Sequence, residues 1–513
     1  MARIRLLSGV LTVGVWTMLS RVLGFVREIL ILSLIGPGPL MDAFVAAFRL
    51  PNMFRRFFAE GAFNSAFVPI FSKKVEDRDA ALEFARNALA WLTLATLTLT
   101  ALGMIFMPGL VWITAAGFSG DERFDLTVDY GRVMFPYIFF MSLAALFSGA
   151  LNATGRFAVA AAAPVLLNIL IVGSLTIAHL TNGVLIAWLI WTVPVAGVAQ
   201  LALTWWAASK AIGPLSLRFP KVSPDVALLL KTAIPAALAT GVMQINLVVG
   251  QLVASRFEGA VSWLFAADRL YQLPLGVIGI AVGIVLLPEL SRRLQAGDTE
   301  GGQSALSRAS EFALFLTVPA AVALVVVPLP LVSVLFERGE TNADDAAAIA
   351  VATAIYGLGL PAFVMQKIQQ PLFFARHDTR SPFYYALAAM VLNAALAFGL
   401  APSLAWMAPA IATSASAWAM VVMLWLGSLR MGEVARFDTR LRSRIWRILA
   451  ASALMGGVLW ALNVVLASSL GTPGLRYLAL AALIFGGAAS YFVFAHGLRA
   501  MRFSELRSAI RRG

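Results

Sequence analysis

Long apolar stretches recur from one end of this chain to the other, and they constrain the fold more than any other feature. Of 513 residues, 60% are hydrophobic and only 13% are charged, whereas a soluble protein carries about 25% charged residues. Stretches of roughly 20–30 apolar residues are long enough to cross the hydrocarbon core of a bilayer as helices. The sequence therefore predicts an all-α polytopic membrane protein.

The stretches number about fourteen, and short polar or glycine-containing turns separate them. The predicted spans are 7–35, 40–71, 86–116, 127–152, 157–180, 183–209, 226–255, 260–289, 306–336, 344–374, 382–401, 404–429, 445–469 and 475–498. The opening "MARIRLLSGVLTVGVW" resembles a signal peptide, but no small-residue cleavage site follows it cleanly. We therefore expect a retained first transmembrane helix.

Basic residues are distributed unevenly between alternate connecting segments. With the N-terminus in the cytoplasm, the cytoplasmic segments hold 27 of the 39 Lys and Arg, and the opposite segments hold five. This asymmetry follows the positive-inside rule and predicts that both termini are cytoplasmic. The net charge of +13 is thus interpreted as anchoring on lipid headgroups, by runs such as "RFDTRLRSRIWR", and not as binding of nucleic acid.

Metal and thiol chemistry is not indicated. The chain contains no cysteine and three histidines, and no spacing typical of a zinc site is present. We predict no metal site and no cofactor.

Two pairs of similar segments indicate an internal repeat. The segment "AFRLPNMFRRFFAEGAFNSAFVPIFSKK" resembles "ADRLYQLPLGVIGIAVGIVLLPELSRR", and this match aligns Arg49 with Arg269. The segment "LNATGRFAVAAAAPVLLN" resembles "FARHDTRSPFYYALAAMVLN", and this match aligns Asn168 with Asn393. The two offsets, 220 and 225 residues, are nearly the same, which favours duplication over chance similarity between apolar helices.

A repeat of six spans keeps the same direction through the membrane in both copies, because six is even. The sequence therefore predicts two six-helix lobes related by a parallel pseudo-twofold axis along the membrane normal, a transporter design. The predicted domains are an N-lobe at 1–222, a C-lobe at 223–432, and a C-terminal helix pair with a basic tail at 433–513.

Seven basic residues remain once the connecting segments and the adjoining helix ends are counted, and they lie within the predicted spans, where each costs at least about 2.5–3.5 kcal/mol at mid-helix. They are Arg21, Arg27, Arg49, Arg55, Arg56, Arg269 and Lys367.

In the second span, charged residues share one helix face. Asp42, Arg49, Arg56 and Glu60 are separated by 7, 7 and 4 residues, so they fall within about 40° of one another on a regular helix. Pro51 is expected to kink this helix. A polar stripe of mixed sign should face a cavity between the lobes and not lipid.

In the first span, Arg21 and Arg27 would lie about 120° apart on a straight helix. A kink at Gly24 would bring both to the cavity, so Gly24 and Pro51 are the predicted hinges. Glu28 is positioned to neutralise one charge.

The excess of arginine over carboxylate favours an anionic ligand, because a guanidinium group binds phosphate bidentately and stays charged when dehydrated. Structural alternatives remain open for each residue. The arginines can be held in ion pairs, with Asp42 and Glu60 as structural partners or gating residues. Arg55 and Lys367 can extend to the membrane interface.

The motifs "SRVLGFVRE", "DAFVAAFRLPNMFRRFFAEGAFNSAFVPIF" and "WLFAADRLYQLPLGVIGIAVGIVLLPELSR" closely resemble those of the MurJ (MviN) family. These proteins are lipid II flippases of the multidrug/oligosaccharidyl-lipid/polysaccharide exporter superfamily. The resemblance implies a transporter, not an enzyme, in the bacterial cytoplasmic (inner) membrane. It would move undecaprenyl-pyrophosphate-linked disaccharide-pentapeptide from the inner to the outer leaflet by alternating access.

The same resemblance implies roles for individual residues. Pyrophosphate binding is carried over to Arg21, Arg27, Arg56 and Arg269, and an essential acidic position to Asp42. Cavity or gating residues are then Asp42, Arg49, Arg55, Glu60, Glu28 and Gln272, the last standing where some relatives have an acidic residue.

Partners are also implied. Lipid II and membrane lipids are the expected partners, and cell-wall synthesis proteins are further candidates. The last two spans resemble the family's groove for the polyprenyl tail. The span 226–255 contains no carboxylate to match the sodium ligands of some members, so sodium coupling is not favoured and the membrane potential stays open as the driving force.

Other functions remain alternatives. The nearest is a related polysaccharide-lipid or multidrug exporter of the same superfamily, although a cation exporter should have an acidic cavity. A membrane-embedded polyprenyl-lipid glycosyltransferase would need a catalytic carboxylate motif in an outer loop, and "GFSGDERFD" and "ERGETNADDA" match none. A scaffold for division proteins would leave the arginines within the spans unexplained.

Overall fold

The computed structural model of the protein describes residues 2–55 and 63–500, and all regular structure in this part of the chain is helical. The predicted all-α class is confirmed. The chain divides into two compact units. The first unit comprises Met1–Ser262 and Arg338–Thr341, and the second comprises Trp263–Glu337 and Asn342–Gly513.

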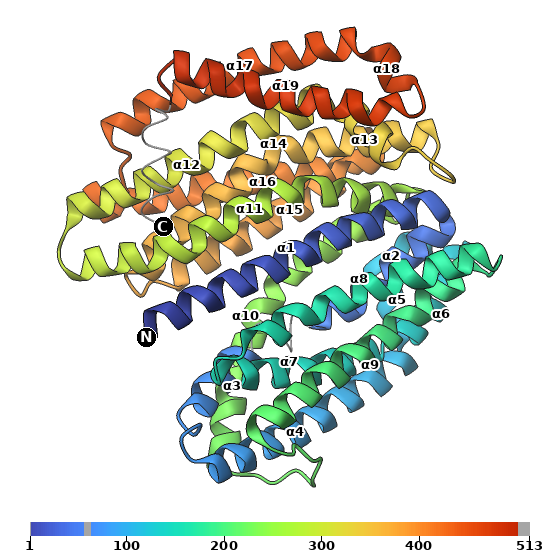
Figure 1. Cartoon of the computed structure of the whole chain (residues 1–513), viewed down its shortest axis with the longest axis vertical. Helices are drawn as coiled ribbons and strands as arrows, with labels where there is room; N and C mark the ends of the chain where they lie inside the picture. The colour runs from blue at the N-terminus through green and yellow to red at the C-terminus, as the bar shows by residue number, and fades with distance from the viewer. Residues whose placement is uncertain (1, 56–62, 501–513) are drawn as a thin grey trace. The chain divides into compact units, whose positions relative to one another are not determined.

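The first unit contains ten α-helices and one 3₁₀ helix within the described residues (Figure 1). They are α1 (Ala2–Leu34), α2 (Pro39–Arg55), α3 (Asn64–Ser72), α4 (Arg78–Ile105), α5 (Met107–Ala115), η2 (Ala116–Phe118), α6 (Glu122–Met134), α7 (Tyr137–Ala153), α8 (Phe157–Leu180), α9 (Leu185–Ile212) and α10 (Pro224–Ala254). The next helix, α11 (Ala260–Gln295), begins in the first unit and continues into the second.

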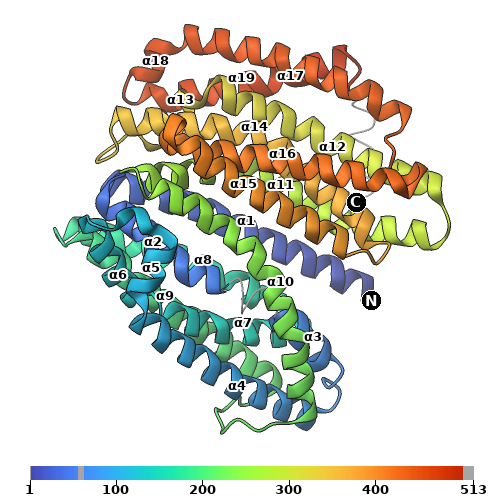
Figure 2. The same ribbon diagram turned by 180° about the vertical axis from the view of Figure 1, so that it is seen from behind.

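Packing in the first unit pairs helices that are distant in sequence. Helix α1 packs against α8, α2 against α6, and α7 against α9. Helix α10 packs against α3, as Figure 2 shows from behind. Part of the core is a stack of phenylalanines in which Phe67 contacts Phe63, Phe71 and Phe84, with ring centroids 5.3–5.5 Å apart. Stacked rings bury a large apolar area, which holds α3 on α4.

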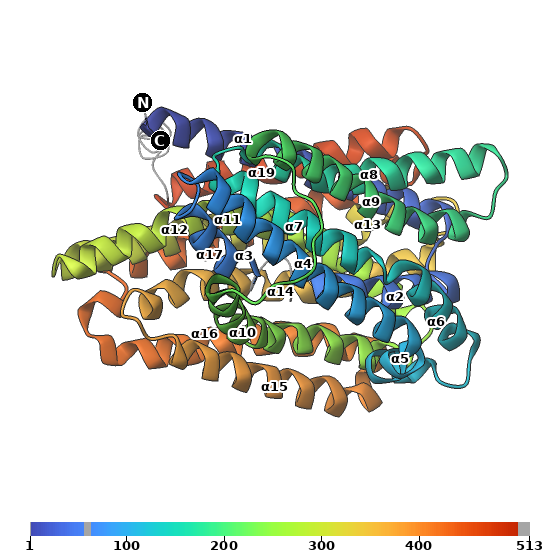
Figure 3. The ribbon, with the colours of Figure 1, turned by 90° about the horizontal axis from the view of Figure 1, so that it is seen from below.

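The second unit contains the remaining helices (Figure 3). They are α12 (Thr299–Val326), α13 (Pro328–Phe336), α14 (Ala343–Phe374), α15 (Arg380–Leu404), η3 (Ala405–Met407), α16 (Ala408–Ser428), η4 (Leu429–Met431), η5 (Glu433–Ala435), α17 (Thr439–Val465), α18 (Ala467–Gly471) and α19 (Leu475–Gly497). Helix α14 packs against α12 and α16, α15 against α16, and the pair α17 and α19 is joined to the rest through α12.

A cluster of charges fastens α17 to α12. Glu311 of α12 is buried and forms ion pairs with Arg308, Arg440 and Arg444. Arg308 also pairs with Asp438, which caps α17. The basic run "RFDTRLRSRIWR" was interpreted as a headgroup anchor. Two of its arginines instead bind a carboxylate within the protein.

Nine segments of the described chain are long and apolar enough to cross a membrane by length and composition. One of them, Arg380–Met431, contains both α15 and α16, so the nine segments provide ten passes. The predicted spans 7–35, 40–71, 226–255 and 260–289 correspond to α1, α2 followed by α3, α10 and α11, which are not among these nine segments.

The order of elements repeats as predicted. The segment Glu122–Ala153 matches Ala343–Phe374, both of 32 residues, at an offset of 221. The nine-residue helices α5 and α13 have the same offset, and each has proline in its first turn. The pairings repeat too, because α7 packs on α9 as α14 packs on α16. The predicted lobe boundaries 1–222, 223–432 and 433–513 remain a prediction, since compactness places α10 in the first unit.

Candidate functional site

Most charged residues of the spans lie in separate groups, and hydrogen bonds and ion pairs hold each group together. Two predicted site residues, Arg56 and Glu60, lie outside the described residues. Pro51 lies inside α2 and Gly24 inside α1, where the chain stays helical on both sides.

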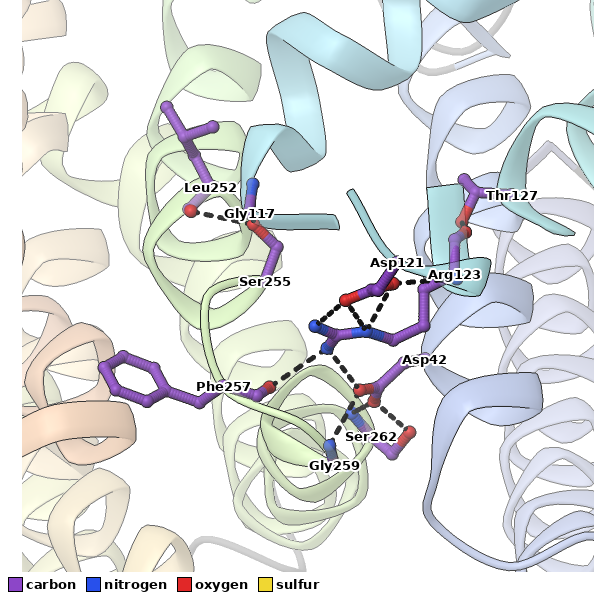
Figure 4. Close-up of polar contacts among 10 residues, drawn as sticks. All are labelled: Asp42, Gly117, Asp121, Arg123, Thr127, Leu252, Ser255, Phe257, Gly259 and Ser262. Atoms are coloured by element: carbon purple, nitrogen blue, oxygen red, sulfur yellow. Dashed lines mark hydrogen bonds and ion pairs between the residues drawn. The ribbon is translucent and has the colours of Figure 1, made fainter. Parts of the chain in front are cut away.

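Asp42, in the first turn of α2, is fully buried. Its carboxylate accepts hydrogen bonds from the backbone N–H of Gly259 (2.8 Å), and from the backbone N–H (2.9 Å) and hydroxyl (2.6 Å) of Ser262 (Figure 4). These donors belong to the start of α11, whose first N–H groups have no partner within the helix. Asp42 therefore caps α11 from another element, and its negative charge complements the positive end of that helix.

Arg123, at the start of α6, completes this group. Its guanidinium group binds both oxygens of Asp121 at 2.6–3.2 Å, and its Nη1 lies 3.4 Å from both Asp42 Oδ2 and the Phe257 carbonyl (Figure 4). The guanidinium carbon lies 4.5 Å from the centre of the Phe118 ring. Burial acts to raise the pKa of Asp121, but the hydrogen bonds and charge of Arg123 outweigh it and hold that pKa below its usual value.

Together, Asp42, Arg123, Asp121 and Ser262 form a latch between the starts of α2, α6 and α11. A neighbouring contact supports it, because the backbone N–H of Gly117 donates to Ser255 Oγ at 3.0 Å. The latch lies where the chain leaves the first unit, since Ser262 is the last residue before the boundary.

A second group forms around Arg27 of α1. Arg27 is buried, its Nη1 donates to Asn168 Oδ1 of α8 at 2.9 Å, and its Nη2 pairs with Glu28. Asn168 Nδ2 donates in turn to the Ser20 carbonyl at 2.9 Å. The predicted neutralisation by Glu28 is confirmed, and Nε of Arg27 has no hydrogen-bond partner within the part of the chain described.

The other arginines of the first unit are more accessible. Arg21 is half-buried, and no ion pair involving it is found among the described residues. Arg49 of α2 donates to the carbonyl of Leu247 in α10 at 3.4 Å. Arg55, the last residue of α2, is half-buried.

Arg269 and Gln272 lie in the second unit. The guanidinium carbon of Arg269 is 4.4 Å from the centre of the Phe265 ring, one turn earlier in α11. Gln272 donates to Asp268, also one turn earlier. The convergence of Arg269 with Arg21 and Arg49 on one cavity remains a prediction.

Four residues of these groups, Asp121, Arg123, Asn168 and Ser262, were not singled out as site residues from the sequence. Arg123 was assigned to an outer connecting segment, and Ser262 shows no pattern of its own. Asn168 was identified only as a repeat match, although an asparagine in the middle of "AAAAPVLLNILIV" is itself a signal of a buried polar contact.

Comparison with known proteins decides the family. The family model described as "Lipid II flippase MurJ" matches residues 31–479. The chain belongs to the lipid II flippase MurJ family. The matched range includes Asp42, Arg49 and Arg269 and begins after Arg21 and Arg27.

Full-length relatives extend this match. A probable lipid II flippase MurJ of Rhizobium meliloti (strain 1021) is 43% identical, over 98% of this chain and 96% of its own. The corresponding protein of Rhizobium tropici is 46% identical, over 88% and 85%. The lipid II flippase MurJ of Burkholderia cenocepacia is 33% identical, over 95% and 96%.

Solved structures agree on the fold. A MurJ structure in an inward closed conformation matches with a TM-score of 0.79 at 24% identity, over 94% of this chain and 98% of its own. An inward-facing multidrug transporter of the MATE family matches with a TM-score of 0.70 at 17% identity, over 81% and 95%. The chain is therefore a multi-pass membrane protein with the fold of both solved structures.

Proposed function

We propose that this chain is a lipid II flippase that carries the lipid-linked precursor from the cytoplasmic to the periplasmic leaflet of the bacterial cytoplasmic membrane. The observation that carries the proposal is the match of the MurJ family model to residues 31–479. The relatives from both Rhizobium species are named probable lipid II flippases. The uneven distribution of basic residues supports cytoplasmic N- and C-termini.

The ligand group is a pyrophosphate, and arginines of the spans would bind it. Arg21 is the first candidate, because its guanidinium group is not engaged in an ion pair within the described chain. Arg27 is already held by Glu28 and Asn168 through Nη2 and Nη1, so its Nε, which makes no hydrogen bond among the described residues, remains able to donate. Exchange of these acceptors for phosphate oxygens would preserve charge-assisted hydrogen bonds throughout.

Transport would follow alternating access, with the polyprenyl tail remaining in the bilayer. The latch around Asp42 is suited to act as the gate at the periplasmic end, because it joins three helix starts through hydrogen bonds that can break together. Lipid II can shift the gate only by the difference in its affinity for the open and closed states. Rebinding of Asp42 to the start of α11 would restore the closed state.

The proposal predicts that replacement of Arg21 or Arg269 with Ala abolishes flipping, while the protein still folds and inserts. A strain depleted of its own flippase and expressing each variant provides the growth test. Exposure of lipid II on the outer leaflet provides the transport test. Arg132→Ala is the matched control, because Arg132 is exposed and pairs weakly with Asp129 at 4.0 Å.

Full activity of both variants would refute the role of arginine in pyrophosphate binding. Native mass spectrometry with defined lipid-linked precursors tests the substrate itself. Equal binding of lipid II and of an unrelated neutral lipid would contradict the proposal.

A further inference from the structure

The connection between α9 and α10 differs from an ordinary polar loop. Residues 213–223, which we name the strap, contain no helix and run beside α4 (Figures 1 and 3). The strap and its neighbours α4, α9 and α10 all belong to the first unit. The strap lies outside the candidate membrane spans, since the span before it ends at Ile212.

Side-chain donors hold the backbone of the strap and its flanking residue in place. Two arginines and a tryptophan of α4 and one tryptophan of α9 donate to four of its carbonyl groups. The pairs are Arg78 to Ile212 (3.0 Å), Arg86 to Pro214 (2.7 Å), Trp91 to Lys221 (3.1 Å) and Trp205 to Leu215 (3.2 Å). The conformation is thus specified by the fold of the first unit.

This fixed backbone presents large apolar side chains outward. Phe219 is 92% exposed, Val222 81% and Leu217 62%. Arg218 and Lys221 alternate with them and are also exposed. In a segment surrounded by water, three such side chains would carry a substantial hydrophobic cost.

The adjoining end of α9 has the composition of a membrane interface. Trp205 and Trp206 are half-exposed, and the ammonium group of Lys210 lies 4.0 Å from the centre of the Trp206 ring. Tryptophan and basic residues gather where a spanning helix leaves the hydrocarbon core. The strap continues directly from this position.

We propose that the strap is a membrane-interface anchor: Leu217, Phe219 and Val222 insert among the lipid acyl chains, and Arg218 and Lys221 bind the anionic headgroups above them. Irregular backbone is normally excluded from such a low-dielectric region because its polar groups lack partners. The four bonded carbonyls remove much of this cost. Charge complementarity selects an anionic lipid surface as the occupant.

The anchor would also fix the start of α10. Ser223 caps this helix by accepting the N–H of Val226 at 3.3 Å, and Asp225 pairs with Lys74 at 3.0 Å. The strap leads straight into these contacts. Insertion of the strap would therefore set the depth at which α10 begins, independently of any transported substrate.

The chain contains no cysteine, so Phe219→Cys creates a unique labelling site on a fully exposed position. We expect an environment-sensitive fluorophore at this site to show blue-shifted emission in nanodiscs of phosphatidylcholine and phosphatidylglycerol. Spin-labelled lipids should quench it strongly, and aqueous iodide weakly. Ala296→Cys is the control, because Ala296 is exposed in the charged turn between α11 and α12.

Equal iodide quenching at positions 219 and 296 would overturn the proposal. Protection of position 219 in native membranes but not in lipid nanodiscs would also overturn it and would favour a protein occupant. Trp91→Phe in the 219-labelled protein removes the N–H donor to the Lys221 carbonyl but keeps an aromatic side chain. We expect this variant to show more iodide quenching. No increase would contradict the role assigned to the bonded carbonyls.

Discussion

Asn168 contacts about two turns of α1, from Ser20 to Arg27. Its side chain accepts from Arg27, donates to the Ser20 carbonyl, and occupies space next to Gly24, where a Cβ atom would lie 3.6 Å from Nδ2. A side-chain donor on a helix carbonyl competes with the helix's own hydrogen bond and favours bending. Asn168 thus contacts both the predicted hinge at Gly24 and Arg27, a predicted ligand-binding residue.

Replacement of Asn168 tests its contacts with Arg27 and with the Ser20 carbonyl. Asn168→Asp supplies Arg27 with a second carboxylate and removes the donor to Ser20, while Asn168→Ala removes both contacts. We expect both to weaken lipid II binding about tenfold or more, because one charge-assisted hydrogen bond contributes about 1.5–3 kcal/mol. Native mass spectrometry titration measures the affinity.

Ser174→Ala on the same helix is the control, because the Ser174 hydroxyl donates to the Ile171 carbonyl of its own helix at 3.0 Å. Unchanged affinity in Asn168→Ala would exclude a positioning role for Asn168.

A second prediction at this scale concerns the contribution of Asp42 to the stability of the folded protein. In Asp42→Asn an amide N–H₂ group faces one of the donors at Gly259 and Ser262, and the charge that offsets Arg123 is lost. Breaking a buried charged contact costs about 3 kcal/mol, so the melting temperature in detergent should fall clearly. Asp129→Asn, at an exposed position, should leave it unchanged, and an equal effect in both variants would contradict the latch.

The charges of Arg27 and Asp42 stand out in apolar runs, and the structure holds both residues in buried polar groups, while their roles toward a ligand remain predictions. Prediction from sequence did not find Arg123 or Ser262, because their importance depends on the approach of 121–123 and 259–262 to α2. That approach is a tertiary event with no local signal. The chemistry of Arg21 and Arg269 toward pyrophosphate remains a prediction.

At the scale of elements, helices extend beyond the spans that hydropathy marks. The span predicted at 86–116 is α4 from Arg78 followed by α5, with a break at Phe106 before Pro108. Asp77 caps α4 through its side chain, so a polar first turn becomes helical outside the apolar stretch. Capping and proline set these ends, whereas hydropathy sets only the middle.

The attachment of α17 is an element-scale prediction. Glu311→Gln leaves Arg308, Arg440 and Arg444 close together without their shared carboxylate. We expect faster amide hydrogen exchange at the start of α17. We also expect the free energy of unfolding to fall by about 3–5 kcal/mol, because a buried ion pair is broken. Glu433→Gln is the control, because Glu433 is exposed and its carboxylate pairs with Arg436 at 3.4 Å. Equal exchange in both variants would show that apolar packing alone holds α17.

For the whole molecule, the first unit is discontinuous in sequence. Residues 338–341, from the turn after α13, dock on the end of α1. The N–H of Glu340 donates to the Ser33 carbonyl at 3.0 Å, and the Thr341 hydroxyl to the Leu32 carbonyl at 2.7 Å. The N–H of Glu340 thus satisfies a carbonyl that the end of the helix leaves open, and the Thr341 hydroxyl adds a second bond to the Leu32 carbonyl, which already accepts from the N–H of Gly36 at 3.0 Å. The repeat was visible in the sequence, but this docking was not, because its partners are about 300 residues apart.

Two glycines with the same backbone angle isolate the docking contribution. Gly36 and Gly297 both have φ +72°, but a Cβ on Gly36 would lie 2.6 Å from the Glu340 carbonyl oxygen, while Gly297 faces open space. Gly297→Ala should lower the free energy of unfolding by about 1–2 kcal/mol, because alanine is strained in the left-handed conformation. Gly36→Ala should cost about 1–3 kcal/mol more, from overpacking. Thermal unfolding measures both, and equal losses would contradict close docking of 338–341.

This interruption has a consequence for biosynthesis. The ribosome adds Arg338–Thr341 only after it has made all of Trp263–Glu337, a stretch that belongs to the other unit. The Ser33 carbonyl must therefore wait through the synthesis of α11, α12 and α13 before its donor, the N–H of Glu340, exists. Membrane insertion of the first helix and completion of its unit are thus separated in time, and a nascent chain arrested before residue 338 would expose this helix end to solvent.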